Sequence, residues 1–343
     1  MLNSFLVLLF EQSLKITVIL LLMVNLILVF PAQAESYSVT EKNFTNLSLA
    51  KGFPQAGPVY NLGGGGLDID DAIQWMINQV RGCNSCANMV DVVIIRESGD
   101  TGYNQAISAM DGVESVKTLF IINREDATKE NIPDQIQDAE VIFFAGGDQC
   151  QYLRNYRNTR VDQAVKSVIA KGGAIGGTSA GAMIQSYFVF NACSDTVSSE
   201  TALQDPYEDI ILNQGLFNWE NFQNTIIDTH FYERDRMGRL ITFIARLLRD
   251  GISDSILGIG IDENTSLIVD KNGLAKVVGD EFVYFVLGDH LPEECEPQTA
   301  LNFRGLKVWK RGEGETFNLN NRLSNDDYYQ ISVENGQLNS TPY

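Results

Sequence analysis

The sequence predicts an α/β fold with three layers, in which helices cover both faces of a mostly parallel sheet and a β-rich extension follows at the C-terminal end. Three observations predict it. Several strand-like segments are apolar throughout, as is typical of strands buried on both faces. Helical segments separate them along the chain, which indicates parallel pairing. Glycine-rich turns follow strand-like segments at residues 63–66 and 146–147 and surround the turn at 176–181.

The first half of this domain alternates strands and helices. A strand from Pro58 runs into the first glycine turn, and a helix follows over residues 67–80. Its apolar face consists of Ile69, Ile73, Met76, Ile77 and Val80. Further strands begin at Val90, Val116 and Glu140, and a helix over residues 161–172 ends at a glycine. Because ligands bind at the carboxyl ends of parallel strands, we expect the glycine turns to gather at one sheet edge.

The second half is richer in β-structure. A strand from Asn224 ends at His230, and a helix begins near Asp235. Segments from Ile256 onward favour strands and hairpins that close the C-terminal side. The polar stretch 192–215 is a candidate cover for the site. Without repeats or a low-complexity linker, residues 58–343 are interpreted as a single catalytic domain.

The N-terminus carries the pattern of a secretory signal peptide over residues 1–34. A basic residue precedes an apolar run at 16–30, and "PAQA" supplies a cleavage site after Ala34. The alternative is an uncleaved anchor, but the run is shorter than the about 20 residues that span a bilayer. We therefore expect a secreted or periplasmic protein that is free of the membrane after cleavage, with residues 35–57 as a polar lead-in.

Charge and cysteine content exclude several classes of protein. The net charge of −19 argues against nucleic-acid binding, which needs a basic surface. Five cysteines include one C-x-x-C pair, Cys83 and Cys86, and the chain has two histidines. In an exported protein, a local disulfide is favoured over a metal site, with two free thiols as the alternative. The odd count leaves at least one of Cys83, Cys86, Cys150, Cys193 and Cys295 unpaired. The turn at 63–66 lacks nucleotide-binding spacing, and no metal or cofactor is predicted.

The stretch "GTSAG", residues 177–181, matches the G-x-S-x-G turn that presents a nucleophilic serine. Ser179 stands at its tip, where a helix begins and its N–H groups favour an oxyanion. The predicted oxyanion donors are the backbone N–H groups of Ala180 and Gly147. The alternative is a tight crossover that carries a bystander serine.

A serine nucleophile needs a base, and the base needs an acceptor that holds its tautomer. His230 ends an apolar strand, which we expect to place it on the same carboxyl sheet edge as Ser179. It is therefore favoured over His290, which lies in a turn-like stretch. Asp262 and Glu263 are both candidates for the acceptor. Neighbours on a strand point to opposite faces, so only one of them can reach the histidine, and the pattern does not decide which.

Polar residues near these segments are candidates for substrate binding. Gln149 follows the second glycine turn. Arg234, Arg236 and Arg239 follow His230, and three guanidinium groups there suggest bidentate recognition of carboxylates. The alternative is a solvated face with salt bridges.

Together, "GGDQ", "GGTSAGA", "DTHF", "RDRMGRL" and "GIGIDENTS" resemble the cyanophycinase family of serine peptidases, related to the aspartyl dipeptidases, over about residues 59–286. The resemblance implies a fold similar to class I glutamine amidotransferases. It implies Ser179 as nucleophile, His230 as base and Glu263 as the acid, and no cofactor. It also places six residues around the substrate: Gln149, Asp228, Thr229, Arg234, Arg236 and Arg239.

The family cleaves cyanophycin, a poly-aspartate backbone with arginine on each β-carboxyl, into β-aspartyl-arginine dipeptides. Thr229 stands where the family usually has glutamine, so other isoaspartyl or acidic peptides are alternative substrates. Two further alternatives come from other classes: an α/β-hydrolase esterase that uses Ser179, Asp262 and His290, and a non-catalytic binder of such polymers. The number of subunits stays open, a homodimer included.

Overall fold

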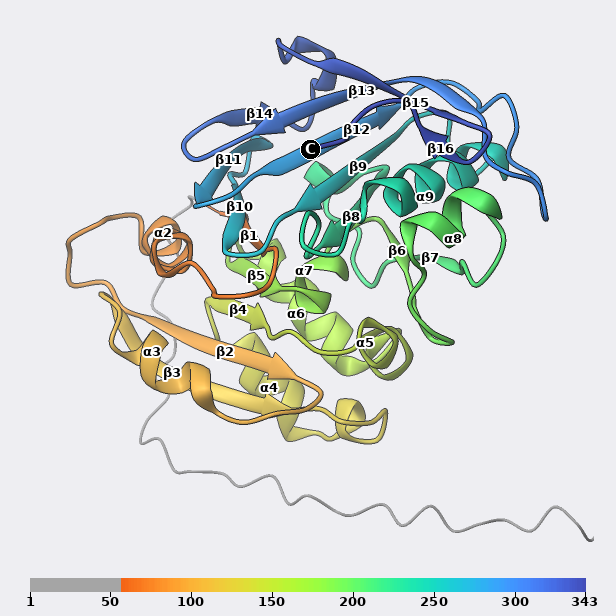
Figure 1. The fold of residues 1–343 in the computed structure, drawn as a ribbon. Coiled ribbons are helices and arrows are strands. Elements are labelled where there is room, and N and C mark those ends of the chain that lie inside the picture. Colours follow the sequence, from red (N-terminus) through yellow and green to blue (C-terminus); the bar gives the residue numbers. More distant parts are fainter. Residues whose placement is uncertain (1–56) are drawn as a thin grey trace, which may run out of the picture. The chain divides into compact units, whose positions relative to one another are not determined.

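The computed structural model describes residues 57–343, which form two mixed sheets (Figure 1). The predicted signal peptide, 1–34, and the lead-in up to residue 56 lie outside the described residues. In the first sheet five strands are parallel, and their order is β1–β5–β4–β2–β3. Their bounds are β1 Val59–Gly63, β5 Ala174–Thr178, β4 Val141–Phe144, β2 Val90–Arg96 and β3 Val113–Phe120. Beyond β1 the sheet continues antiparallel with β10 Thr265–Val269, β11 Leu274–Gly279 and β14 Thr316–Asn318.

The second sheet has the order β16–β15–β13–β12–β9–β8–β6–β7. Its middle strands β6, β8 and β9 are parallel, and the rest pair antiparallel. The strands from β6 to β9 are β6 Phe188–Phe190, β7 Leu212–Gln214, β8 Thr225–Thr229 and β9 Ile256–Ile261. The C-terminal strands are β12 Val283–Gly288, β13 Phe303–Arg311, β15 Tyr329–Glu334 and β16 Gln337–Leu338.

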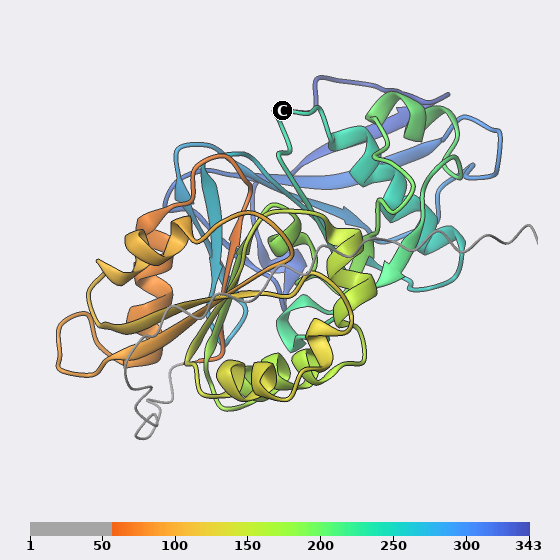
Figure 2. The same cartoon turned by 90° about the horizontal axis from the view of Figure 1, so that it is seen from below.

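Helices cover both faces of the first sheet (Figure 2). On one face lie α2 Asp70–Arg81 and α3 Gly102–Ser108, and on the other α4 Asn131–Gln137, α5 Gln149–Tyr156 and α6 Arg160–Ala170. Strand β2 contributes to both interfaces, because Val92 and Ile94 pack on the α2 side while Val93 and Ile95 pack on the α6 side. This two-sided burial explains why the strand shows no polar alternation. The predicted three-layer α/β fold with a β-rich C-terminal part is confirmed.

The second sheet has its own helical cover. Helices α8 Ser199–Gln204 and α9 Met237–Arg249 share an apolar cluster with β6, β8, β12 and β13. Helix α9 is buried along most of its length. The short α7, Ala180–Met183, contacts both β5 and β8 and so lies between the two sheets. One-turn 3₁₀ helices occur at Asp126–Thr128, Glu220–Phe222 and Arg322–Ser324.

One sequence-based expectation about the fold was wrong. We expected the strand that ends at His230 to share a sheet edge with the strand before Ser179. Instead, β5 belongs to the first sheet and β8 to the second. An apolar run reports that a strand is buried but carries no information about its pairing partner, so the pattern could not reveal the division into two sheets.

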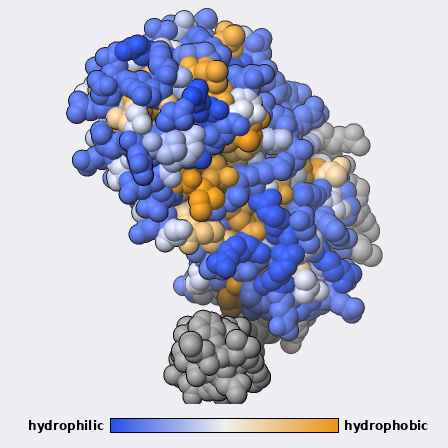
Figure 3. Space-filling model, turned by 90° about the vertical axis from the view of Figure 1, so that its right-hand side faces the viewer, coloured by the Kyte–Doolittle hydropathy of each residue, from blue (hydrophilic) through white to orange (hydrophobic). Residues whose placement is uncertain are grey.

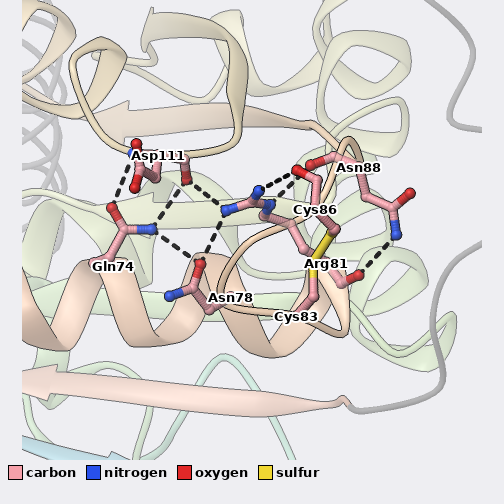
Figure 4. Close-up of a disulfide and its surroundings, with 7 residues drawn as sticks. All are labelled: Gln74, Asn78, Arg81, Cys83, Cys86, Asn88 and Asp111. Atoms are coloured by element: carbon pink, nitrogen blue, oxygen red, sulfur yellow. Dashed lines mark hydrogen bonds between the residues drawn. A yellow bond between two sulfur atoms is a disulfide. The ribbon is translucent and has the colours of Figure 1, made fainter.

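Two disulfides occur within the described part of the chain. The predicted local pair Cys83–Cys86 follows α2 (Figure 4). Beside it, the buried Arg81 side chain donates to the carbonyl oxygens of Cys86, Asn88 and Asp111. The guanidinium group thus ties the disulfide loop to the turn before β3.

The second disulfide, Cys150–Cys193, joins the first turn of α5 to the loop after β6. It therefore connects a helix that covers the first sheet to a loop that follows a strand of the second. The remaining cysteine, Cys295, is an unpaired, buried thiol.

Within residues 57–343, no helix combines the length and the apolar character that a membrane span requires. The face shown in Figure 3 is mostly hydrophilic, with hydrophobic residues in separate patches.

Candidate active site

Ser179 lies at the sharp turn between β5 and α7. Its backbone adopts φ 52° and ψ −123°, a strained conformation for a residue with a side chain. The neighbouring glycines are needed for close backbone approach. A Cβ on Gly177 would lie 2.5 Å from the carbonyl oxygen of Gly181, and one on Gly181 would overlap that of Phe144. The composition of "GTSAG" therefore follows from how tightly the turn is packed.

His230 follows β8 and is hydrogen-bonded on both sides of its ring. Its Nε2 lies 2.8 Å from Ser179 Oγ, and its Nδ1 lies 2.5 Å from Glu263 Oε1. The His230 side chain is 12% exposed and that of Glu263 is 29% exposed. Such a chain of hydrogen bonds can transfer the serine proton to the imidazole while the carboxylate holds the ring.

The surroundings of His230 favour its neutral form. Burial lowers the pKa of the imidazole below its ordinary value of 6.5, and the positive charges of Arg234 and Arg236 lower it further. Glu263 opposes these effects. A neutral imidazole can accept a proton, as a general base must.

Of the two acidic candidates, the structure brings Glu263 to the histidine. The carboxylate of Asp262 points elsewhere and accepts hydrogen bonds from the backbone N–H groups of Tyr232, at 2.9 Å, and Phe282, at 3.3 Å. Burial raises the pKa of Asp262 to about 7. The two neighbours thus face different surroundings, although both lie in the turn between β9 and β10 rather than on a strand.

His290 lies apart from this arrangement. Its Nδ1 bonds to Asp289 at 2.9 Å, its Nε2 bonds to the carbonyl oxygen of Arg304 at 2.8 Å, and the side chain is 42% exposed. The esterase alternative requires His290 and Asp262 to meet Ser179, but both have other partners in this structure.

A buried ion cluster flanks His230 in the sequence. It consists of Asp228, which precedes the histidine, and Arg236 and Arg239, which follow it. Asp228 is fully buried, and Arg239 donates to both of its carboxylate oxygens, at 2.7 and 2.6 Å. Arg236 donates to Asp228 at 3.2 Å and to the carbonyl oxygen of Thr229 at 2.6 Å.

This cluster differs from the sequence-based expectation, in which three arginines face a substrate or solvent. Arg236 and Arg239 are three residues apart on one helical face and so reach the same carboxylate. Among the three, Arg234 is the exposed one.

The remaining candidates lie around Ser179. Gly146 is close, since a Cβ there would lie 3.5 Å from Ser179 Cβ. The carboxylate of Glu97 accepts from the N–H of Asp148 at 3.0 Å and so braces the turn that contains Gly147. Gln149 begins α5, and its Nε2 donates to the carbonyl oxygen of Phe190 at 3.5 Å.

Two candidates next to the proposed nucleophile and base are buried. Ala180 is the first residue of α7 and directly follows Ser179. Thr229 is fully buried, and its Oγ1 has no hydrogen-bond partner within residues 57–343.

Sequence reasoning missed two features of the site. The carbonyl oxygens of Gly63 and Gly64 accept hydrogen bonds from the backbone of Ser179 and His230, whereas the sequence predicts only that this turn lies at the ligand-binding sheet edge. The phenol of Tyr343 accepts from the N–H of Met237 and donates to Asp235, each at 3.0 Å, and so holds the turn that carries Arg234. The run of four glycines was a usable signal for the first feature, and no local pattern signals the second.

Comparison with known proteins defines the class of this chain. Residues 112–277 match the family model of peptidase family S51. The cyanophycinases of Nostoc sp. and Trichormus variabilis are each 27% identical to this chain over 226 residues. The match covers 64% of this chain and 71% of each cyanophycinase. The cyanophycinase of Geminocystis herdmanii is 26% identical over 212 residues, 60% of this chain and 72% of its own.

A solved structure shares the fold. It is that of a peptidase from an acI-B1 Actinobacterium, with a TM-score of 0.52 and 18% identity, and the match covers 77% of this chain and 98% of that one. The chain is a hydrolase of the serine-peptidase type. These similarities point to the S51 peptidases and cyanophycinases, the family that the sequence motifs resemble.

Proposed function

We propose that this protein is an exported exopeptidase that hydrolyses cyanophycin to β-aspartyl-arginine dipeptides, with Ser179, His230 and Glu263 as its catalytic residues. The observation that carries the proposal is the hydrogen-bond chain from Ser179 Oγ through His230 to Glu263. The three residues come from segments far apart in the sequence, yet they meet at hydrogen-bond distance. The similarity to cyanophycinases supports the choice of substrate.

The catalytic cycle begins with the hydroxyl of Ser179. His230 takes its proton at Nε2 while Ser179 Oγ attacks the scissile carbonyl carbon, and Glu263 stabilises the imidazolium that forms. The N–H groups of Ala180 and Gly147 bind the oxyanion. One such donor contributes about 10²–10³ in rate. His230 then returns the proton to the leaving amine, and water hydrolyses the acyl-enzyme by the reverse sequence of steps.

Substrate carboxylates bind Arg234 in this proposal. Its guanidinium group is exposed beside His230, and the planar donor pairs of arginine match a carboxylate. Gln149 is partly exposed at the start of α5, and Thr229 is buried directly before His230. Arg236 and Arg239 act through Asp228, because both pair with its single buried carboxylate and so hold β8 against α9.

Two parts of the proposal depend on the sequence alone. Export to the periplasm or medium is proposed from the predicted signal peptide at residues 1–34. The choice of peptide substrate depends on position 229. This chain has Thr229 there, and its side chain is shorter than that of the glutamine usual in the family. A related isoaspartyl or acidic peptide is therefore the second candidate substrate.

The decisive experiment is mass spectrometry of the products that the mature enzyme, residues 35–343, releases from insoluble cyanophycin. We expect β-aspartyl-arginine, and no release by the Ser179→Ala variant with an unchanged circular dichroism spectrum. Undiminished release by this variant would refute the nucleophile. Products only from other isoaspartyl peptides would shift the assignment to the second candidate.

A further inference from the structure

We propose that the glycine turn at residues 63–66 positions the catalytic residues, and that Gly65 is the positioning residue for the imidazole of His230. The expected effect of this turn on catalysis rests on the proposed function. The structural part of the inference stands on hydrogen bonds and packing alone.

Three successive carbonyl groups of this turn each receive a different part of the site. Gly63 O accepts from the N–H of Ser179 at 3.0 Å, Gly64 O accepts from the N–H of His230 at 2.7 Å, and Gly65 O accepts from the N–H of Asn264 at 2.9 Å. Asn264 directly follows Glu263. One short segment therefore contacts the carriers of the proposed nucleophile, base and acid.

These three hydrogen bonds hold residues with unfavourable backbone conformations. Ser179, His230 and Asn264 have φ angles of 52°, 48° and 54°, in the region that residues with side chains rarely adopt. Such conformations persist where surrounding contacts over-determine them. The carbonyl groups of the turn supply such contacts at each of the three positions.

The turn must also be free of side chains. A Cβ on Gly65 would overlap Cε1 of the His230 ring and lie 2.7 Å from both ring nitrogens, and one on Gly64 would overlap the carbonyl oxygen of Asp262. The imidazole thus rests directly against the backbone of Gly65. This contact sets how far the ring can move away from Ser179 Oγ and Glu263.

The test is the Gly65→Ala variant with Gly314→Ala as its matched control. Gly65 has φ 106° and Gly314 has φ 80°, so both substitutions strain the backbone, but a Cβ on Gly314 meets nothing within 4 Å. Because the chain has two histidines, their NMR titrations can be followed separately, and His290 serves as an internal reference. Covalent labelling of Ser179 by a fluorophosphonate measures reactivity without the natural substrate.

We expect Gly65→Ala to displace the ring by about 1 Å, since carbon atoms pack at about 3.5 Å. The His230 titration should shift while that of His290 stays, and labelling should slow about 100-fold. Gly314→Ala should leave both measurements unchanged. If Gly65→Ala matches Gly314→Ala in titration and labelling, the positioning role is wrong.

Two further outcomes are separable. If Gly65→Ala does not fold, Gly66→Ala replaces it, because a Cβ there would lie 2.6 Å from Asn264 Oδ1 and 3.1 Å from Glu263 Cβ. This variant should also shift the His230 titration, and an unshifted titration would overturn the inference. A wild-type protein that resists labelling would refute Ser179 as an activated nucleophile, while the NMR titrations would still decide whether the turn positions His230.

Discussion

Ser179 Oγ and His230 Nε2 lie 2.8 Å apart, although the strands that precede them belong to different sheets. The chain crosses between the sheets again at Glu263, which lies between β9 of the second sheet and β10 of the first. The proposed catalytic residues therefore meet where the two sheets adjoin, rather than along one sheet edge.

The two histidines should differ sharply in their importance. His230→Ala should lower kcat by about 10⁶, because Ser179 loses its proton acceptor. His290→Ala should leave kcat within about twofold, since its ring bonds to Asp289 and Arg304 instead. Steady-state kinetics on cyanophycin or an isoaspartyl peptide measure both. Equal losses in the two variants would contradict the assignment of the base.

The pH dependence of kcat/KM should reflect the lowered pKa of His230. The neutral imidazole is the active form, so activity should persist below pH 6.5 and fall only as the pH drops through the lowered pKa. Arg234→Gln removes a positive charge that lowers this pKa, and the acidic limb should then move to higher pH. Arg249→Gln, at the C-terminal end of α9, serves as the control. A limb that stays in place in Arg234→Gln would show that this charge does not act on the imidazole.

The buried ion cluster should be important for stability. Asp228→Asn leaves two buried guanidinium groups without a counter-charge and should lower the free energy of unfolding by about 3–5 kcal/mol. The exposed Asp254 offers a matched control, since Asp254→Asn should change the free energy of unfolding by less than about 0.5 kcal/mol. Urea unfolding measures both values. Similar stabilities for the two variants would argue that the cluster is not needed for folding.

The two disulfides should contribute unequally. In the chain-entropy view, the Cys150–Cys193 bridge, 43 residues apart, contributes about 4 kcal/mol, and the Cys83–Cys86 bridge, 3 residues apart, about 2 kcal/mol. Replacing each pair by alanine and measuring urea unfolding tests this order. Loss of the longer bridge should also raise KM, because Gln149 adjoins Cys150 in the first turn of α5. The reverse order of stabilities would contradict the prediction.

The sequence predicted the parts of this protein that local patterns encode. The apolar strands, the helix over most of residues 70–81 and the serine turn are visible because periodicity and glycine spacing are local signals. Glu263 was reached through family resemblance, since strand alternation alone left Asp262 open.

Other features depend on distant partners. The capture of Arg236 and Arg239 by Asp228, the Cys150–Cys193 bridge and the contact of Tyr343 with the Arg234 turn join residues that no local pattern relates. The residue types were visible in the sequence, but their partners were set by how the two sheets pack together.

The glycine turn also limits how this enzyme can diverge. The turn contributes backbone carbonyl groups and the absence of side chains. A substitution there adds a Cβ that collides with the residues of the site. Laboratory evolution towards new peptides should therefore leave residues 63–66 untouched and accumulate changes in the exposed segment around Arg234 and in the loop after β6.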